Sequence, residues 1–225
     1  MRVLAIGAHP DDVEIGCGGA LLAHRRAGDE LAVLVMSDGD NSAEQRTRVA
    51  EQEDAADFLG AELMWGGFKD GSVPDGRESI QAVEAAISRF MPDVVYTHAP
   101  QDTHQDHRAT ASASISATRR VSRVLCYESP TSVSFSPSFF VDVNGLVEQK
   151  LDLIRCHISQ VMKNGIVDLE AVEAQARFRG FAARARQAEG FQVHRFLLDP
   201  AMIGLSAKAQ ADDEPIAKAG SEYDD

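Results

Sequence analysis

The sequence is poor in cysteine and contains no long apolar run. Its three cysteines, Cys17, Cys126 and Cys156, are odd in number, far apart and without a C-x-x-C pair, so neither a disulfide framework nor a thiolate zinc site is expected. No apolar run approaches the roughly 20 residues needed to cross a bilayer, and the first residues contain no basic-then-apolar leader. These features predict a cytoplasmic protein without membrane insertion.

Positive charge is also scarce. The chain has 22 lysine and arginine residues against 35 aspartate and glutamate residues, which gives a formal net charge of -13 at pH 7. Such a charge repels phosphate backbones and anionic lipids, and the cationic residues form no stripe interleaved with aromatic residues. Nucleic acid and membrane surfaces are therefore disfavoured as partners.

What the chain does contain is an alternation of short apolar runs and helical patterns. Strands are predicted at residues 4–6, 31–36, 62–65, 93–97, 121–127, 139–143 and 191–198. Helices are predicted at residues 18–27, 42–59, 80–90, 108–118, 150–160 and 169–178. This alternation is typical of an α/β protein with a Rossmann-like, mostly parallel sheet and helices on both faces. We expect one domain over residues 1–206 and an acidic, disordered tail over 207–225.

Two loops combine imidazole and carboxylate groups. The first, residues 8–12 (Ala-His-Pro-Asp-Asp), follows the first strand, and the second, residues 104–107 (His-Gln-Asp-His), follows the strand at 93–97. By itself the first loop is also typical of a turn whose aspartate caps the next helix. The second loop favours a different interpretation, because ligands bind at the carboxyl ends of strands in open α/β sheets. We expect the two loops to face each other there and form an active site.

Histidine and carboxylate without thiolate suit a zinc-type ion in a catalytic site that keeps one position for water. A water on such an ion has its pKa lowered toward ~7 and becomes a nucleophile. A spare carboxylate can accept its proton, and a spare histidine can stabilise the oxyanion or protonate the leaving group. The loops therefore predict metal-dependent hydrolysis of an amide or ester. Their spacing leaves open which of Asp11 and Asp12 binds the metal.

At these two loops the sequence resembles the LmbE-like, or PIG-L, N-acetylglucosaminyl deacetylases, whose signatures are A-H-P-D-D and H-x-D-H. The similarity extends over about residues 1–200 and includes weaker matches at 48–51, 157–160 and 188–191. The resemblance implies a zinc-dependent N-deacetylase, a hydrolase of carbon–nitrogen bonds in linear amides. Its expected substrate is a small N-acyl sugar conjugate of the N-acetylglucosamine type, and a homo-oligomer is compatible with it.

The resemblance also assigns the metal ligands. His9, Asp12 and His107 would hold Zn²⁺ or another divalent metal. The family often places glutamate directly after its two aspartates, whereas here Val13 intervenes and Glu14 follows. This departure predicts either a slightly different loop position or a helix-capping role for Glu14.

The remaining roles are implied in the same way. Asp11 would be the general base, and His104 would stabilise the oxyanion or act as the acid. Asp106 would fix the ring of His104. Arg48 and Asp102 would contact the substrate, with Asp102 standing where some relatives carry a tyrosine.

Two other functions compete with hydrolysis. A dinucleotide-binding module would suit the opening strand–helix–strand unit, but residues 7–12 place carboxylates where the G-x-G-x-x-G fingerprint approaches pyrophosphate. A non-catalytic sugar-binding or repurposed relative would keep the fold, yet it would not require the complete set of catalytic groups. The sequence leaves open the aglycone and the roles of His98 and His157.

Overall fold

The computed structural model describes residues 1–38, 45–162 and 167–200. The strands are β1 (Arg2–Gly7), β2 (Glu30–Ser37), β3 (Glu62–Phe68), β4 (Val94–His98), β5 (Arg123–Tyr127), β6 (Phe139–Asp142) and β7 (Ala188–Phe196). The helices are α1 (Asp12–Arg26), α2 (Gln45–Leu59), α3 (Arg77–Phe90), α4 (Gln105–Ala117), α5 (Val147–Arg155), α6 (Ile158–Val161) and α7 (Leu169–Ala183). The tail predicted at 207–225 lies outside the described residues, so its disorder stays a prediction.

The strands form one sheet of seven in the order β3-β2-β1-β4-β5-β7-β6. The first five in this order run parallel, and β7 runs antiparallel to both β5 and β6. The predicted mostly parallel α/β sheet is confirmed. The chain changes its direction of travel across the sheet between β1 and β4, which pair directly. In open α/β sheets this switch point is where ligands bind.

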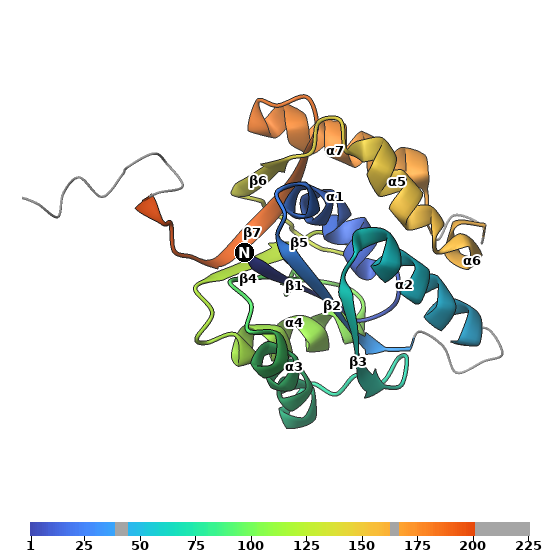
Figure 1. Ribbon diagram of the computed structural model, residues 1–225, viewed down its shortest axis with the longest axis vertical. Coiled ribbons are helices and arrows are strands. Elements are labelled where there is room, and N and C mark those ends of the chain that lie inside the picture. Colours follow the sequence, from blue (N-terminus) through green and yellow to red (C-terminus); the bar gives the residue numbers. More distant parts are fainter. Residues whose placement is uncertain (39–44, 163–166, 201–225) are drawn as a thin grey trace, which may run out of the picture.

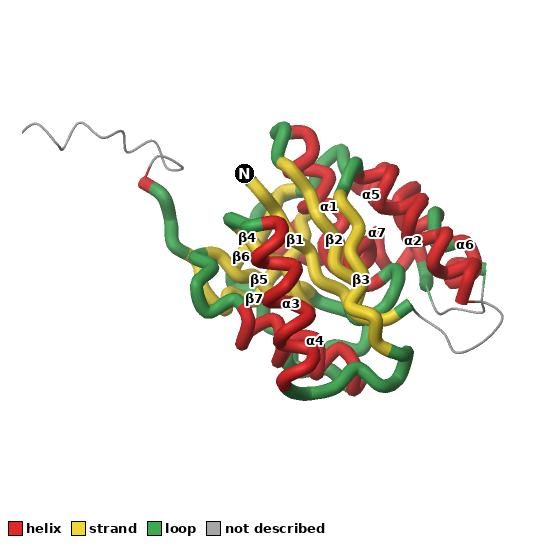
Figure 2. Tube along the Cα trace, turned by 60° about the horizontal axis from the view of Figure 1, so that its bottom comes forward, coloured by secondary structure: helices red, strands yellow, loops and turns green. Residues whose placement is uncertain are grey.

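Helices cover both faces of the sheet, which lies between them as the yellow layer of Figure 2. In Figure 1, α1, α2, α5 and α7 lie on one side of the sheet and α3 and α4 on the other. Side chains of β1 alternate between the two cores: Val3 and Ala5 pack under α1, whereas Leu4 and Ile6 pack under α3 and α4. No helix within the described ranges combines the length and apolar character needed to span a membrane.

The first helix begins earlier than the sequence pattern predicts. α1 starts at Asp12, not residue 18, and it is kinked at Cys17, whose φ is -143°. Beyond the kink, the backbone N–H groups of Gly19 and Ala20 donate to the two carboxylate oxygens of Glu189. Asp11 occupies the N-cap position, but its side chain makes no capping hydrogen bond. The capping interpretation of the first loop is therefore wrong, and the Asp11 carboxylate is left for another role.

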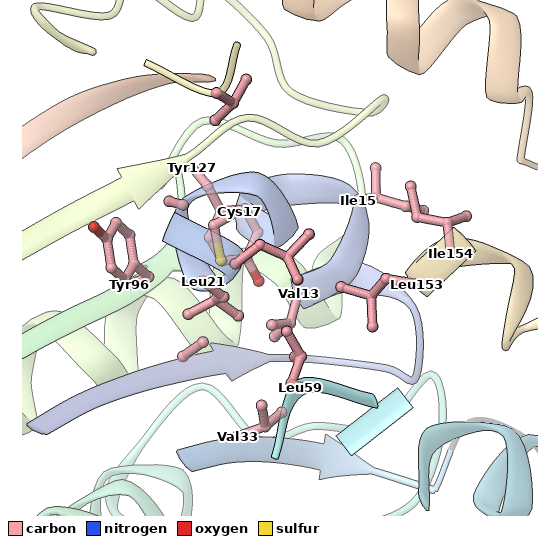
Figure 3. Packing of buried hydrophobic residues seen from close by; sticks show 14 of the residues in the cluster. Val13, Ile15, Cys17, Leu21, Val33, Leu59, Tyr96, Tyr127, Leu153 and Ile154 are labelled. Atoms are coloured by element: carbon pink, nitrogen blue, oxygen red, sulfur yellow. The ribbon is translucent and has the colours of Figure 1, made fainter. Parts of the chain in front are cut away.

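Gly16 permits α1 to lie against the sheet. Figure 3 shows Tyr127 beside this part of α1, among Val13, Cys17 and Leu21. A Cβ atom at Gly16 would lie 2.1 Å from Cδ2 of Tyr127. That ring is fully buried, and its hydroxyl donates to the carbonyl of Ile6 over 2.8 Å, so it cannot swing aside freely.

We therefore expect Gly16→Ala to lower the free energy of unfolding by about 1–3 kcal/mol through overpacking. Gly18→Ala is the matched control in the same helix, because its Cβ would lie 3.2 Å from a methyl group of Leu153, at the end of a flexible side chain. Urea denaturation of both variants measures the difference. Equal stability of the two variants would contradict the packing argument.

Candidate active site

The two predicted loops meet at the switch point of the sheet. Residues 8–12 follow β1, and residues 104–107 follow β4 and open α4. The ring centroid of His9 lies 4.7 Å from that of His104 and 5.4 Å from that of His107. The expectation that the loops face each other is confirmed, because β1 and β4 are parallel neighbours whose carboxyl ends share one edge.

Asp12 lies at the centre of a buried group of imidazoles. Its Oδ2 is 3.3 Å from Nδ1 of His9 and 3.1 Å from Nε2 of His98, and its Oδ1 is 3.3 Å from Nε2 of His107. The N–H groups of Ala8 and His9 also donate to Oδ2, over 3.1 and 2.7 Å. Burial raises the pKa of Asp12, but the imidazoles outweigh burial and hold it well below its usual range. The carboxylate is therefore ionised and directed into the site.

Asp11 faces a different environment. Its Oδ2 lies 3.6 Å from the guanidinium of Arg48, which also donates to the carbonyl of Pro10 over 2.7 Å. Burial and the neighbouring Asp12 carboxylate raise the pKa of Asp11 to about 7, although Arg48 opposes the shift. A carboxylate with a pKa near neutrality is suited to accept and return a proton. The substrate contact predicted for Arg48 stays a prediction, because the contacts observed are with the loop itself.

Asp106 does not hold the ring of His104 as predicted. Its carboxylate lies 3.1 Å from Nε2 of His9 and accepts the N–H groups of Gly71 and Val73. His104 is the N-cap of α4, and its Nδ1 accepts the backbone N–H of Asp106 over 3.2 Å. The cap geometry thus directs the main chain of Asp106 toward His104 and its side chain toward the β1 loop.

Asp102, predicted to contact the substrate, makes its observed contacts within the protein. It is 6% exposed, and its Oδ2 lies 3.2 Å from Nδ1 of His107 and accepts the hydroxyl of Ser129. Its other oxygen accepts the backbone N–H of His104 over 2.8 Å. Burial raises the pKa of Asp102, but His107 and Ser129 outweigh it and hold the value well below normal. Asp102 therefore orients His107, and its predicted contact with the substrate stays a prediction.

Three overlapping sets of side chains bring three donor atoms within 4.8 Å of one another in the described part of the chain. These sets are His9 with His104 and His107, Asp12 with His98 and His107, and His9 with Asp70 and Asp106. The predicted ligands His9, Asp12 and His107 do not occur together in any one of these sets of described residues, but Asp12 contacts His9 through Oδ2 and His107 through Oδ1. Their role as the ligand set stays a prediction.

Residues 4–118 match the model of the PIG-L family, described as GlcNAc-PI de-N-acetylase. The match spans just over half of the 225 residues and contains both loops. The chain belongs to the PIG-L family.

Individual proteins extend the likeness beyond the PIG-L match. The Escherichia coli K12 protein named uncharacterized deacetylase YaiS is 37% identical over 150 residues, which cover 63% of this chain and 81% of YaiS. The solved structure of N,N'-diacetylchitobiose deacetylase from Pyrococcus horikoshii has a TM-score of 0.75 at 26% identity, covering 85% of this chain and 83% of its own. GalB, the 4-carboxy-2-hydroxymuconate hydratase from Pseudomonas putida KT2440, has a TM-score of 0.76 at 20% identity, covering 88% and 98%. The last likeness shows the fold alone.

The donor atoms of this PIG-L chain fit a divalent cation. Imidazole nitrogens and carboxylate oxygens are the ligand types that zinc takes in catalytic sites, and Asp12 lies 3.3 Å from His9 through Oδ2 and 3.3 Å from His107 through Oδ1. Burial lowers the pKa of His9, but hydrogen bonds with Asp106, Asp12 and Asp70 outweigh it and raise the pKa to about 12. The surrounding carboxylates therefore favour a positive charge at this point of the site.

The sequence patterns do not point to Asp70 of the PIG-L site, and they leave the role of His98 open. Asp70, in the loop after β3, places Oδ1 3.1 Å from Nε2 of His9. His98, the last residue of β4, is fully buried and stacks on His107 with ring centroids 4.1 Å apart. Burial lowers the pKa of His98 to about 4, so it is neutral. Their location in the sequence is the feature that indicates a place in the site, because both residues lie at or just beyond the carboxyl end of a strand.

Proposed function

We propose that this chain is a zinc-dependent N-deacetylase that hydrolyses the acetamide of a small N-acetylglucosamine-type sugar conjugate. The observation that carries the proposal is the convergence of His9, Asp12 and His107 beside Asp11 and His104, in a chain of the PIG-L family. It is supported by relatives named as deacetylases, two of them after diacetylchitobiose. The predicted cytoplasmic location and homo-oligomer stay predictions.

His9, Asp12 and His107 would hold the ion. Asp106 and Asp102 support this role by fixing the rings of His9 and His107 from behind, as carboxylates commonly do for histidine ligands. When bound, zinc supplies Lewis acidity, which lowers the pKa of a water molecule and polarises the amide carbonyl. All proton movements are then left to side chains of the protein.

Asp11 is suited to move the proton. As the water oxygen bonds to the carbonyl carbon, the Asp11 carboxylate accepts one of the water's protons. When the carbon–nitrogen bond breaks, the same carboxyl group returns the proton to the departing amine, which yields the acid and the free amino sugar. Asp11 is suited to this role because it lies next to the predicted ligand Asp12 in sequence and its own observed ionic neighbour is Arg48, at 3.6 Å.

His104 is suited to stabilise the oxyanion. Because its Nδ1 accepts the N–H of Asp106, the neutral ring carries its proton on Nε2. Burial and the nearby rings of His9 and His107 lower the pKa of His104, so the ring is neutral at pH 7 and donates a hydrogen bond. Of the two roles implied by the resemblance, this geometry favours oxyanion stabilisation over proton donation.

The same loop is poorly suited to bind a dinucleotide. Backbone N–H groups in this position bind pyrophosphate in dinucleotide-binding proteins, but here those of Ala8 and His9 already donate to Asp12. The ionised Asp12 carboxylate occupies the space that the anion would need and repels it.

The proposal is tested by incubating the purified protein with N,N'-diacetylchitobiose and with N-acetylglucosaminides of differing aglycones, and measuring free amine and acetate. We expect amine release, about one zinc ion per chain, loss of activity with a chelator and recovery with added zinc. A zinc-loaded protein that releases no amine from any of these sugars would overturn the proposal. Tight binding of NAD by metal-free protein would support the dinucleotide alternative instead.

A further inference from the structure

The backbone of Asp11 has an unusual conformation. Its φ is 90° and its ψ is -25°, in the left-handed region that few residues other than glycine adopt. Such a conformation persists only where surrounding contacts determine it. Because the Asp11 side chain makes no capping hydrogen bond, those contacts must come from elsewhere.

One contact comes from α2. The N–H of Asp11 donates to Oε1 of Gln52 over 3.3 Å, and Gln52 is fully buried. One turn earlier in α2, Arg48 holds the carbonyl of Pro10 over 2.7 Å. The same face of α2 therefore binds both the carbonyl and the N–H of the single peptide group that joins Pro10 to Asp11.

The orientation of the Gln52 amide is fixed by Glu14. Nε2 of Gln52 donates to Oε1 of Glu14 over 2.8 Å. The carboxylate can only accept and the Asp11 N–H can only donate, so a single orientation of the amide satisfies both neighbours. Glu14 is the glutamate displaced by one place from the family pattern, and it is fully buried. Its carboxylate holds Gln52.

His157 lies against the other oxygen of Glu14. Its Nε2 is 3.4 Å from Oε2 of Glu14, and its side chain is fully buried. Within the described residues neither ring nitrogen of His157 has a hydrogen-bond partner. The imidazole thus gives the buried carboxylate a charge-compensating neighbour, which such a group requires.

A second set of contacts, two hydrogen bonds, fixes the position of His157 relative to α2. Both carboxylate oxygens of Glu51, the neighbour of Gln52, accept hydrogen bonds from Ser159 over 2.7 Å, one from its N–H and one from its hydroxyl. The start of α6 is thereby attached to the helix that carries Gln52. The weak family match at residues 157–160 falls on this connection.

We propose that Gln52, Glu14 and His157 are positioning residues, which hold the backbone of Asp11 in its left-handed conformation and so set the direction of its carboxylate. The inference rests on the proposed deacetylase function for its catalytic consequence. Its structural part, the conformation of Asp11, can be measured without any substrate.

The main test is Gln52→Leu, which keeps a similar volume but neither accepts from Asp11 nor donates to Glu14. A misplacement of about 1 Å costs on the order of 10²-fold in rate, so we expect kcat to fall roughly 10- to 100-fold with KM and zinc content unchanged. Glu189→Gln is the matched control, since Glu189 is another buried carboxylate bonded to α1, beyond the kink. It is expected to keep the wild-type kcat even where it lowers the melting temperature. Equal kcat in both variants would overturn the proposal.

A double variant separates positioning from a general structural role. In the Asp11→Asn background, Gln52→Leu should cause no further loss of kcat, because it acts through the Asp11 carboxylate. Losses that multiply would show that Gln52 acts elsewhere. Glu14→Gln keeps an oxygen for Gln52 and should retain most of the activity, whereas Glu14→Leu should resemble Gln52→Leu. This pair provides the same test if Gln52→Leu does not fold.

A crystal structure of Gln52→Leu tests the inference independently of activity. We expect Asp11 to leave the left-handed region and its carboxylate to move. An unchanged Asp11, with φ still near 90°, would overturn the positioning role even in an active enzyme. Conversely, a wild-type chain that releases no amine from any N-acetyl sugar would overturn the proposed function, while the conformation of Asp11 in the variant would still decide this proposal.

Discussion

Asp12→Ala is expected to remove the bound metal and lower deacetylase activity by about 10³-fold or more, since a catalytic metal supplies several kcal/mol of transition-state stabilisation. The reason lies in the contacts of Asp12, which joins His9 and His107 through its two oxygens. Without this carboxylate the two rings lose the anion that brings them together. The N–H of His9 also loses its acceptor, and the N–H of Ala8 keeps only Nε2 of His98, so the loop itself loosens.

Metal content measured by mass spectrometry, alongside amine release, checks this expectation. His107→Ala should behave in the same way, while His194→Ala, an exposed histidine on β7, should keep both metal and activity. Full metal occupancy in both Asp12→Ala and His107→Ala would contradict the ligand assignment. It would place the ion instead on the set formed by His9, Asp70 and Asp106.

The fold could be predicted from sequence wherever the signal was local. Runs such as residues 31–36 are apolar throughout because β2 is covered by helices on both faces of the sheet. The start of α1 was misplaced because Gly16, Gly18 and Gly19 are typical of a loop. In the structure, the absence of a Cβ atom at these glycines leaves space for the side chains of Tyr127, Leu153 and Glu189. These partners are more than 100 residues away, so no local pattern reports them.

The site, like the fold, could be predicted from sequence only in part. Its two loops could be predicted, because strand ends and clustered ligand groups are visible in sequence, and their meeting follows from the parallel pairing of β1 and β4. The partner of each carboxylate could not be predicted. Asp106 contacts His9, which lies 97 positions away in the sequence. Asp102 contacts His107, which follows it closely in the sequence. Both pairings depend on side-chain directions that are set by the start of α4.

The second large effect is expected at Asp11. Asp11→Asn should retain zinc and lower kcat by about 10²- to 10⁴-fold, the usual contribution of a general base. Zinc should remain because Asp11 is absent from each of the close donor sets found in the described part of the chain. Its observed ionic neighbour is Arg48, at 3.6 Å.

Asparagine is the informative replacement here because it tolerates the left-handed conformation better than most residues. The backbone at φ 90° can therefore persist, and the variant removes proton acceptance while keeping the shape of the side chain. Asp11→Ala would add a backbone penalty and mix the two effects. Steady-state kinetics with parallel zinc analysis distinguish the outcomes. A variant that turns over within about threefold of wild type, well short of the usual loss, would show that another group accepts the proton.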